Sequence, residues 1–251
     1  MLFRPVAAET LTLPLPAGRE THFAFESGLL ELALQYAPGD HSLEIISLEG
    51  LSQKRMFNML DDGQVNVLLA GYSREAEADL LQIDYPLTKG LQGYRLFITR
   101  EDTFETLDDV ASHDDLKSVC IGSGNSWVDT LILEHAGLCV VGGPGHNLYT
   151  MLENGLSQHG LMVYQNLLVR YPYDFYFYVR RDSKPLHDLI EQGFQAATEN
   201  GAIDKYFQAH PGITYATRFL QDHPDLRIID LGNPEMTENN SADIHRYWLE
   251  H

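Results

Sequence analysis

The sequence has 251 residues, of which 44% are hydrophobic and 10% aromatic, a composition that supports one large core or two small ones. Seventeen Lys and Arg residues stand against 36 Asp and Glu residues, giving a formal net charge of −19. Such a surface repels nucleic acids and anionic lipid headgroups, so neither is expected as a partner. No apolar run approaches the roughly 18 residues that a membrane helix needs.

The first third of the chain alternates predicted strands with predicted helices. Leucines at every second position and short apolar runs indicate strands at residues 11–15, 43–46 and 65–69. Apolar residues at helical spacing indicate one helix after Ser27, a candidate N-cap, and a second at residues 52–60. This order is typical of a parallel sheet.

A second alternation follows a less regular stretch at residues 71–93. Strands are predicted at residues 94–99, 118–121, 138–141, 161–163 and 174–181. Helices are predicted at residues 106–111, 126–135, 147–153, 185–198 and 202–209. Two αβ series without a flexible linker predict two lobes, with residues 1–96 and 182–251 in the first and residues 97–181 in the second. The chain is expected to cross between the lobes near Phe97 and Tyr178.

The two cysteines, Cys120 and Cys139, are too few for a four-ligand zinc site or a disulfide-dense scaffold. We expect them to act as small buried hydrophobic residues. They fall on consecutive predicted strands, and whether they can bridge depends on side-chain directions that the sequence leaves open.

One glycine-containing segment follows a predicted strand and opens a predicted helix. Its donors Ser123, Asn125 and Ser126, with the backbone N–H groups, are placed to contact an anion or a polar ligand. Trp127 stands where a dinucleotide-binding motif has its third glycine, which argues against such a cofactor, and it offers a stacking face instead. A plain glycine turn with a Ser or Asn cap explains the segment about equally well.

A second candidate segment comes just after the predicted strand at residues 65–69, where open α/β sheets place ligands. There Arg74 has the planar fork that holds a carboxylate, and Ser73 adds a hydroxyl donor. A surface arginine paired with Glu75 or Glu77 explains the sequence equally well.

Catalytic and metal-binding motifs are missing from the sequence. It contains no Gly-x-Ser-x-Gly and no His-Glu-x-x-His pattern, and its 11 histidines have no ligand spacing. We therefore expect no catalytic residue, no metal and no cofactor.

A series of segments between about Leu29 and Phe207 occurs in the order found in one protein family. They are residues 29–34, 53–67, 85–95, 121–127, 151–155 and 175–186. In this order they resemble a divergent bacterial periplasmic solute-binding protein of the polar-amino-acid type. The resemblance implies an α/β fold of type II periplasmic-binding-protein topology, the "Venus flytrap", with a ligand cleft between two lobes.

The binding residues of that family carry over only in part. Its members usually hold the ligand carboxylate with an arginine three residues after a threonine or serine, and here Ala76 stands at that spacing from Ser73. Arg74 is the candidate substitute, and the family's acidic residue for the ligand amine has no counterpart after Gly155. The expected aromatic walls are Tyr72, Trp127 and Tyr164.

The resemblance implies an extracytoplasmic solute-binding protein that is not an enzyme. It would capture a small polar molecule, an amino acid or a related compound, for the membrane permease of an ABC transporter. A monomer in the periplasm is expected, with an export signal removed ahead of Met1. Two alternatives stay open: a sensory ligand-binding domain of the same fold, and a small-molecule enzyme that uses the same cleft.

Overall fold

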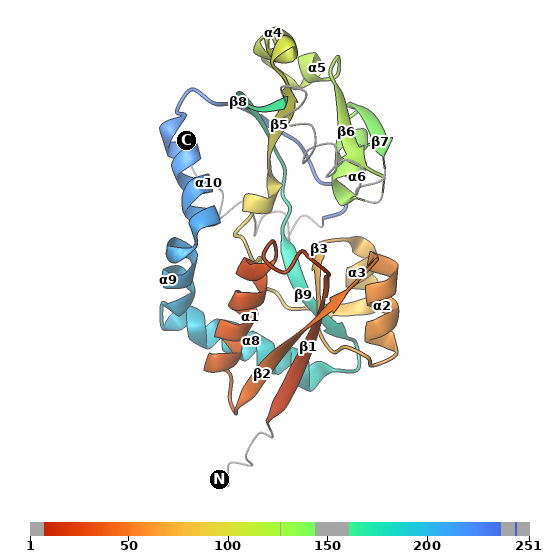
Figure 1. Cartoon of the computed structure of the whole chain (residues 1–251), viewed down its shortest axis with the longest axis vertical. Coiled ribbons are helices and arrows are strands. Elements are labelled where there is room, and N and C mark those ends of the chain that lie inside the picture. The colour runs from red at the N-terminus through yellow and green to blue at the C-terminus, as the bar shows by residue number, and fades with distance from the viewer. Residues whose placement is uncertain (1–7, 126, 144–160, 237–243, 245–251) are drawn as a thin grey trace. The chain divides into compact units, whose positions relative to one another are not determined.

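The computed structural model describes residues 8–125, 127–143, 161–236 and 244. Its chain divides into two compact units, each made from two separate stretches (Figure 1). Unit 1 comprises Met1–Leu87 and Phe175–Thr217, and unit 2 comprises Thr88–Asp174 and Arg218–His251. The predicted helix at residues 147–153 lies outside the described residues.

Two sets of strands form the sheet structure of unit 1. β1 (Glu9–Pro16) pairs in parallel with β2 (His41–Leu48), as predicted. β9 (Phe175–Arg180) pairs antiparallel with both β3 (Leu68–Gly71) and β4 (Leu80–Gln82). The backbone just before β3 donates two hydrogen bonds, of 3.4 and 3.3 Å, to the carbonyl oxygen of Thr12 in β1. β1 and the β3 segment are thereby joined.

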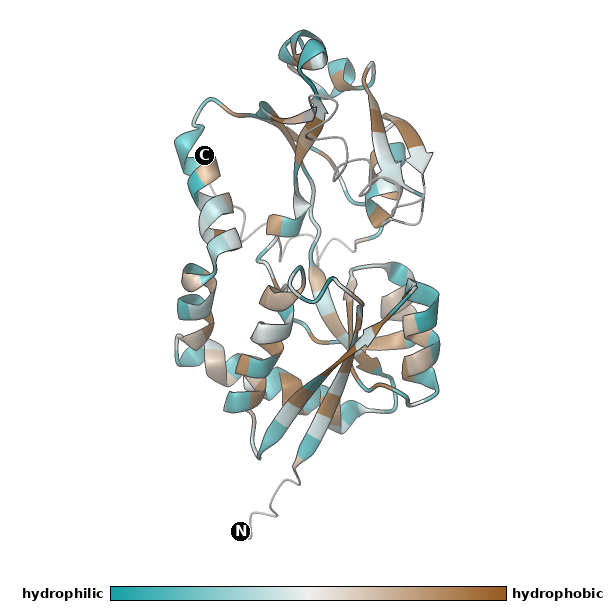
Figure 2. Ribbon diagram, viewed as in Figure 1, coloured by the Kyte–Doolittle hydropathy of each residue, from teal (hydrophilic) through white to brown (hydrophobic). Residues whose placement is uncertain are grey.

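Helices cover these strands. They are α1 (Ala24–Tyr36), α2 (Gln53–Asp61), α3 (Arg74–Asp79), α8 (Lys184–Glu199) and α9 (Ala202–Ala209). Hydrophobic residues are concentrated along the strands of unit 1, whereas α2 is largely hydrophilic (Figure 2). α1 and α8 approach closely, because a Cβ on Gly193 would lie 2.3 Å from the carbonyl oxygen of Ala33. Ser27, expected as an N-cap, lies inside α1, where its hydroxyl donates to the Phe23 carbonyl at 2.9 Å.

Unit 2 is built around one long strand. β8 (Leu161–Arg170) pairs antiparallel with β5 (Tyr94–Arg100) and in parallel with β10 (Arg227–Asp230). β6 (Cys120–Gly124) and β7 (Cys139–Gly143) form a separate parallel pair. The helices are η1 (Leu91–Gly93), η2 (Glu101–Thr103), α4 (Phe104–Asp108), α5 (His113–Leu116) and α6 (Val128–His135). Leu116, Ile132 and Leu167 are fully buried at the centre of its core.

The units differ from the expected lobe boundaries in three places. Residues 88–96 belong to unit 2, because β5 pairs with β8. β9 belongs to unit 1, because both of its partners, β3 and β4, are there. The segment from Arg218 belongs to unit 2, because β10 pairs with β8, so residues 182–251 do not lie in a single unit. α10 (Pro211–Asp222) spans the last boundary, and Phe97 and Tyr178 lie inside β5 and β9.

The two cysteines are joined in a disulfide, so the expectation that they are small buried hydrophobic residues is wrong. They stand directly opposite each other in β6 and β7, with Cα atoms 4.5 Å apart. Cys120 is exposed and Cys139 is half-buried. The strand register therefore supplies the side-chain direction that the sequence left open.

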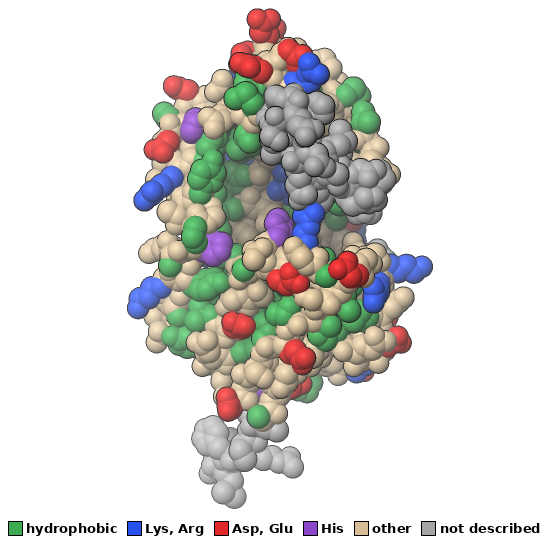
Figure 3. Space-filling view, in the orientation of Figure 1, with side chains coloured by type: hydrophobic (Ala, Val, Ile, Leu, Met, Phe, Trp, Pro, Cys, Tyr) green, Lys and Arg blue, Asp and Glu red, His purple; other side chains and the backbone are tan. Residues whose placement is uncertain are grey.

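Acidic side chains are spread over the face drawn in Figure 3, consistent with the net charge of −19. Within the described ranges, no helix combines the length and the apolar character needed to cross a membrane.

Candidate functional site

The candidate residues of unit 1 follow β3 directly. The hydroxyl of Ser73 accepts a hydrogen bond from the Ala76 backbone N–H at 3.2 Å and so caps α3. Ser73 is 6% exposed, Ala76 is fully buried and Arg74 is exposed. The Tyr72 ring is fully buried and meets Tyr176 edge-on, so the expected aromatic wall is not accessible at this position. Ligand contacts by these residues stay a prediction.

The candidate loop of unit 2 begins at the carboxyl end of β6. Ser123 is 3% exposed, and its Oγ lies 2.7 Å from the hydroxyl oxygen of Thr130 on α6. The same Thr130 oxygen lies 2.6 Å from the Gly124 carbonyl oxygen. Thr130 on α6 thus joins the helix to β6 by short polar contacts.

Two glycines make room for the side chains of this loop. A Cβ on Gly124 would lie 2.6 Å from the Trp127 indole, which therefore covers that glycine. A Cβ on Gly142 in β7 would lie 2.1 Å from the Asn125 amide oxygen. Asn125 is exposed, Trp127 is half-buried, and Ser126 lies outside the described residues. The structure brings Ser123, Asn125 and Trp127 together at one edge of the β6–β7 pair.

Tyr164 faces another part of unit 2. It is 1% exposed, and its hydroxyl donates to the Asp108 carboxylate and accepts from Arg227 Nη2 at 2.8 Å. Burial is the largest effect that raises the pKa of Tyr164 above the usual value, and the hydrogen bond to Asp108 raises it further. The expected aromatic wall is therefore not accessible at Tyr164 either.

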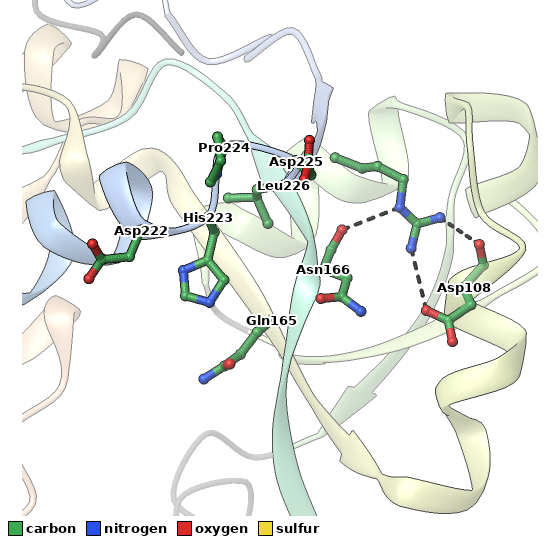
Figure 4. A pocket seen from close by; sticks show the side chains of 9 residues that line it. Asp108, Gln165, Asn166, Asp222, His223, Pro224, Asp225 and Leu226 are labelled. Carbon is green, nitrogen blue, oxygen red and sulfur yellow. Dashed lines mark hydrogen bonds and ion pairs between the residues drawn. The ribbon is translucent and has the colours of Figure 1, made fainter.

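A shallow pocket of about 490 Å³ lies beside Tyr164, and α10 and β8 contribute to its lining (Figure 4). The lining residue Arg227 donates to the backbone carbonyls of Leu107, Asp108, Val110 and Asn166 as well as to Tyr164. These five bonds use all five N–H groups of the guanidinium. Arg227 thus fastens the end of α4 to β10 and has no donor left for a ligand.

Arg95 in β5 is a candidate that the sequence did not single out. Its Nε and Nη2 both lie 2.7 Å from Oδ1 of Asp129, in the first turn of α6, and Tyr171 donates its hydroxyl to the same oxygen. Burial disfavours the positive charge and so lowers the pKa of Arg95. The electrostatic interactions with Tyr171 and Asp129 are together larger than this effect, and the net result is a raised pKa. Burial also raises the pKa of Tyr171 and of Tyr173. Arg95 is therefore a permanent cation beside two neutral phenols.

A glycine sets the distance between Arg95 and the tyrosines. The Gly93 carbonyl accepts from the Tyr171 N–H at 3.2 Å, and a Cβ on Gly93 would lie 1.9 Å from the Tyr171 carbonyl oxygen. No larger residue permits this backbone approach.

Asp174 organises the turn just before this strand. Its fully buried carboxylate accepts from the Thr88 N–H at 3.0 and 3.1 Å, from the Thr88 hydroxyl at 3.0 Å and from the Gly90 N–H at 2.6 Å. One buried carboxylate thus holds the backbone and side-chain donors of a whole turn. Among the described residues, no group of three or more His, Cys, Asp and Glu side chains is placed to hold a metal ion.

No protein-family model matches this sequence, and no curated protein matches it. Solved structures do match it. The ancestral amino acid-binding protein AncCDT-1, a precursor of cyclohexadienyl dehydratase, is 13% identical with a TM-score of 0.56, over 79% of this chain and 94% of its own. The amino acid ABC transporter substrate-binding protein AbpA from Streptococcus pneumoniae, bound to L-arginine, is 16% identical with a TM-score of 0.52, over 84% and 95%.

A third structure concerns glutathione import via GshT and the cystine ABC importer TcyBC of Streptococcus mutans. It is 14% identical, with a TM-score of 0.54, over 93% of this chain and 100% of its own. At such identities the likeness establishes the fold. The chain has the α/β fold of two-lobed type II periplasmic binding proteins, which confirms the predicted fold class.

Proposed function

We propose that this chain is an extracytoplasmic solute-binding protein that captures a small polar molecule, an amino acid or a related compound, for the permease of an ABC transporter. The observation that carries the proposal is the polar loop at the carboxyl ends of β6 and β7, in a fold shared with amino-acid-binding proteins. Carboxyl ends of parallel strands are where α/β folds bind ligands. Asn125 is exposed there beside the half-buried Trp127, which supplies an aromatic face.

The disulfide supports the proposed compartment. Disulfides persist in oxidising environments such as the bacterial periplasm and the extracellular space, and they are rare where thiols are kept reduced. Cys120 is exposed, so a reducing cytosol would have access to the bond. The bridge therefore favours a location outside the cytoplasm.

An enzyme is the second candidate function, because the similar structure AncCDT-1 is described as a precursor of cyclohexadienyl dehydratase. Such an enzyme would convert a solute in the same place that a binding protein holds it. The two candidates differ in one observable, which is the appearance of product.

A thermal-shift screen of the full chain tests the proposal. The panel contains amino acids, organic acids, polyamines and sugars, and each positive solute is followed by product analysis. A solute present at a hundred times its dissociation constant stabilises the folded state by about 2.7 kcal/mol. We expect a clear shift with at least one solute and no product. Turnover of any solute, with no shift from the others, would overturn the binding role.

A matched pair of variants links the shift to the loop. Asn125→Ala removes an exposed amide beside Trp127, and we expect it to weaken binding of the solute. Asn58→Ala removes an exposed amide on α2, in the other unit, and serves as the control. Equal affinity in both variants would remove Asn125 from the site.

A further inference from the structure

The guanidinium of Arg95 is fixed in place from three directions within unit 2. Its Nε donates to Asp129 Oδ1 at 2.7 Å, and its Nη2 forms an ion pair with the same oxygen at 2.7 Å. The guanidinium carbon lies 5.6 Å from the centre of the Tyr171 ring and 5.7 Å from that of the Tyr173 ring. Both rings are almost completely buried, at 0% and 6% exposure. Because its position is already set, Arg95 would lose little conformational entropy on binding a ligand.

One edge of this guanidinium is available to a ligand. Among the described residues, none accepts a hydrogen bond from Nη1 of Arg95, and 34% of the side-chain surface is exposed. The other partly buried arginines of unit 2 are used differently. Arg170 binds both oxygens of Asp230 and donates from Nη1 to the Tyr94 hydroxyl, and all five N–H groups of Arg227 are bonded.

The carboxylate of Asp129, beside Arg95, is less available to a ligand than the guanidinium. Oδ1 of Asp129 accepts from Arg95 Nε and from the Tyr171 hydroxyl and pairs with Arg95 Nη2, and the Asp129 side chain is 16% exposed. Asp129 also lies in the first turn of α6, where the helix dipole offsets negative charge. The more exposed member of the pair is the cation.

We propose that Arg95 is a solute-binding residue and that the solute it selects carries a carboxylate. This inference rests on the proposed function and specifies its substrate class. The free edge of a guanidinium offers parallel N–H donors whose spacing matches the two oxygens of a carboxylate. A phosphate dianion is disfavoured, because Arg95 and Asp129 together are formally neutral and bring no second cation.

The test compares matched ligands on matched variants of the full chain. The ligands are the L-amino acids and the four- to six-carbon dicarboxylates, each beside the corresponding carboxamide, with inorganic phosphate as a separate arm. The variants are Arg95→Gln and Arg95→Lys. The control is Arg100→Gln, which removes an exposed arginine of the same strand that pairs with Asp102 at 2.6 Å on the surface.

We expect an acid to bind the unmodified protein and its carboxamide to bind more weakly. Arg95→Gln should weaken binding of the acid roughly ten- to a hundredfold, and Arg95→Lys should retain part of it, because the charge stays while the fork is lost. Arg100→Gln should bind normally. Calorimetric titration measures each affinity, and circular dichroism shows which variants fold.

Several results would overturn the inference. Equal affinity in the unmodified protein and Arg95→Gln would do so, as would equal binding of acid and carboxamide, or binding confined to phosphate, polyamines or sugars. Each of these leaves the proposed solute-binding role standing. If Arg95→Gln fails to fold, Arg95→Lys and the acid–carboxamide pair decide the matter. If no solute binds the unmodified protein, the proposed function fails and the inference fails with it.

Discussion

The disulfide between Cys120 and Cys139 should contribute a large share of the stability of unit 2. The bridge joins residues 19 apart in sequence, and closing a loop of that length removes chain entropy from the unfolded state worth about 3 kcal/mol at 25 °C. That is a substantial fraction of the roughly 5–15 kcal/mol that stabilises a typical protein. The closed loop contains α6, so the Arg95 partner Asp129 lies inside it.

Urea unfolding of the oxidised protein, the reduced protein and the Cys120→Ser/Cys139→Ser variant measures this contribution. A loss of about 3 kcal/mol lowers the unfolding midpoint of unit 2 by roughly 1–3 M urea. Reductant should destabilise the unmodified protein to the level of the double variant and leave the double variant unchanged. If the reduced and oxidised proteins unfold within about 0.5 kcal/mol of each other, the entropic reasoning is refuted.

Three further perturbations have expected outcomes. Gly193→Ala should cost about 1–3 kcal/mol in urea unfolding, because the new Cβ would press on the Ala33 carbonyl between α1 and α8. Asp174→Asn should cost about 2–3 kcal/mol in the same assay, because an amide replaces one acceptor that buried N–H groups require. Raising the pH above about 10 should destabilise unit 2, because burial raises the pKa of Tyr171 and Tyr173 in the folded state. The contribution of the two tyrosines to the free energy of unfolding is complete below their pKa in the unfolded chain and is lost as the pH rises toward their pKa in the folded protein. Tyrosinate absorbance follows this ionisation.

Each of these outcomes has a control or a contrary result. Gly232→Ala places its Cβ in open space and should be nearly neutral. Asp102→Asn breaks only an exposed ion pair and should cost less than about 1 kcal/mol. Tyrosinate that forms at the ordinary pKa with the protein still folded would contradict the account of the buried tyrosines.

The alternation of strands and helices was predictable because its signals are local. Leucines at every second position mark β1, and apolar residues at helical spacing mark α1, α8 and α9. Sequence reasoning missed α3, β4, α10 and β10, and the first two have weak local signals. α3 is six residues long and rich in charge, and it forms where Ser73 caps it and Ala76 is buried. β4 has three residues and depends on pairing with β9.

The residues of the candidate site also differ in whether a local sequence signal predicts them. The loop at Ser123, Asn125 and Trp127 was predictable, because glycines between a strand and a helix are a local pattern. The burial of Tyr72 and Tyr164 was not, since an aromatic residue on or after a strand can face either the core or solvent. Arg95 had no local signal, because Asp129 is 34 residues away and only the folded chain brings them together.

Gly93 shows that the character of a site can depend on a position that carries no side chain. Its bare Cα lets the backbone of Tyr171 come close enough for that ring to lie against Arg95. A mutagenesis library aimed at new ligand preferences would naturally vary the side chains around the arginine. Varying Gly93 as well would shift both tyrosines at once, so the effect of any other substitution on ligand binding could not be separated from that shift. Redesign of this protein should therefore hold residue 93 fixed and treat the glycine as part of the scaffold.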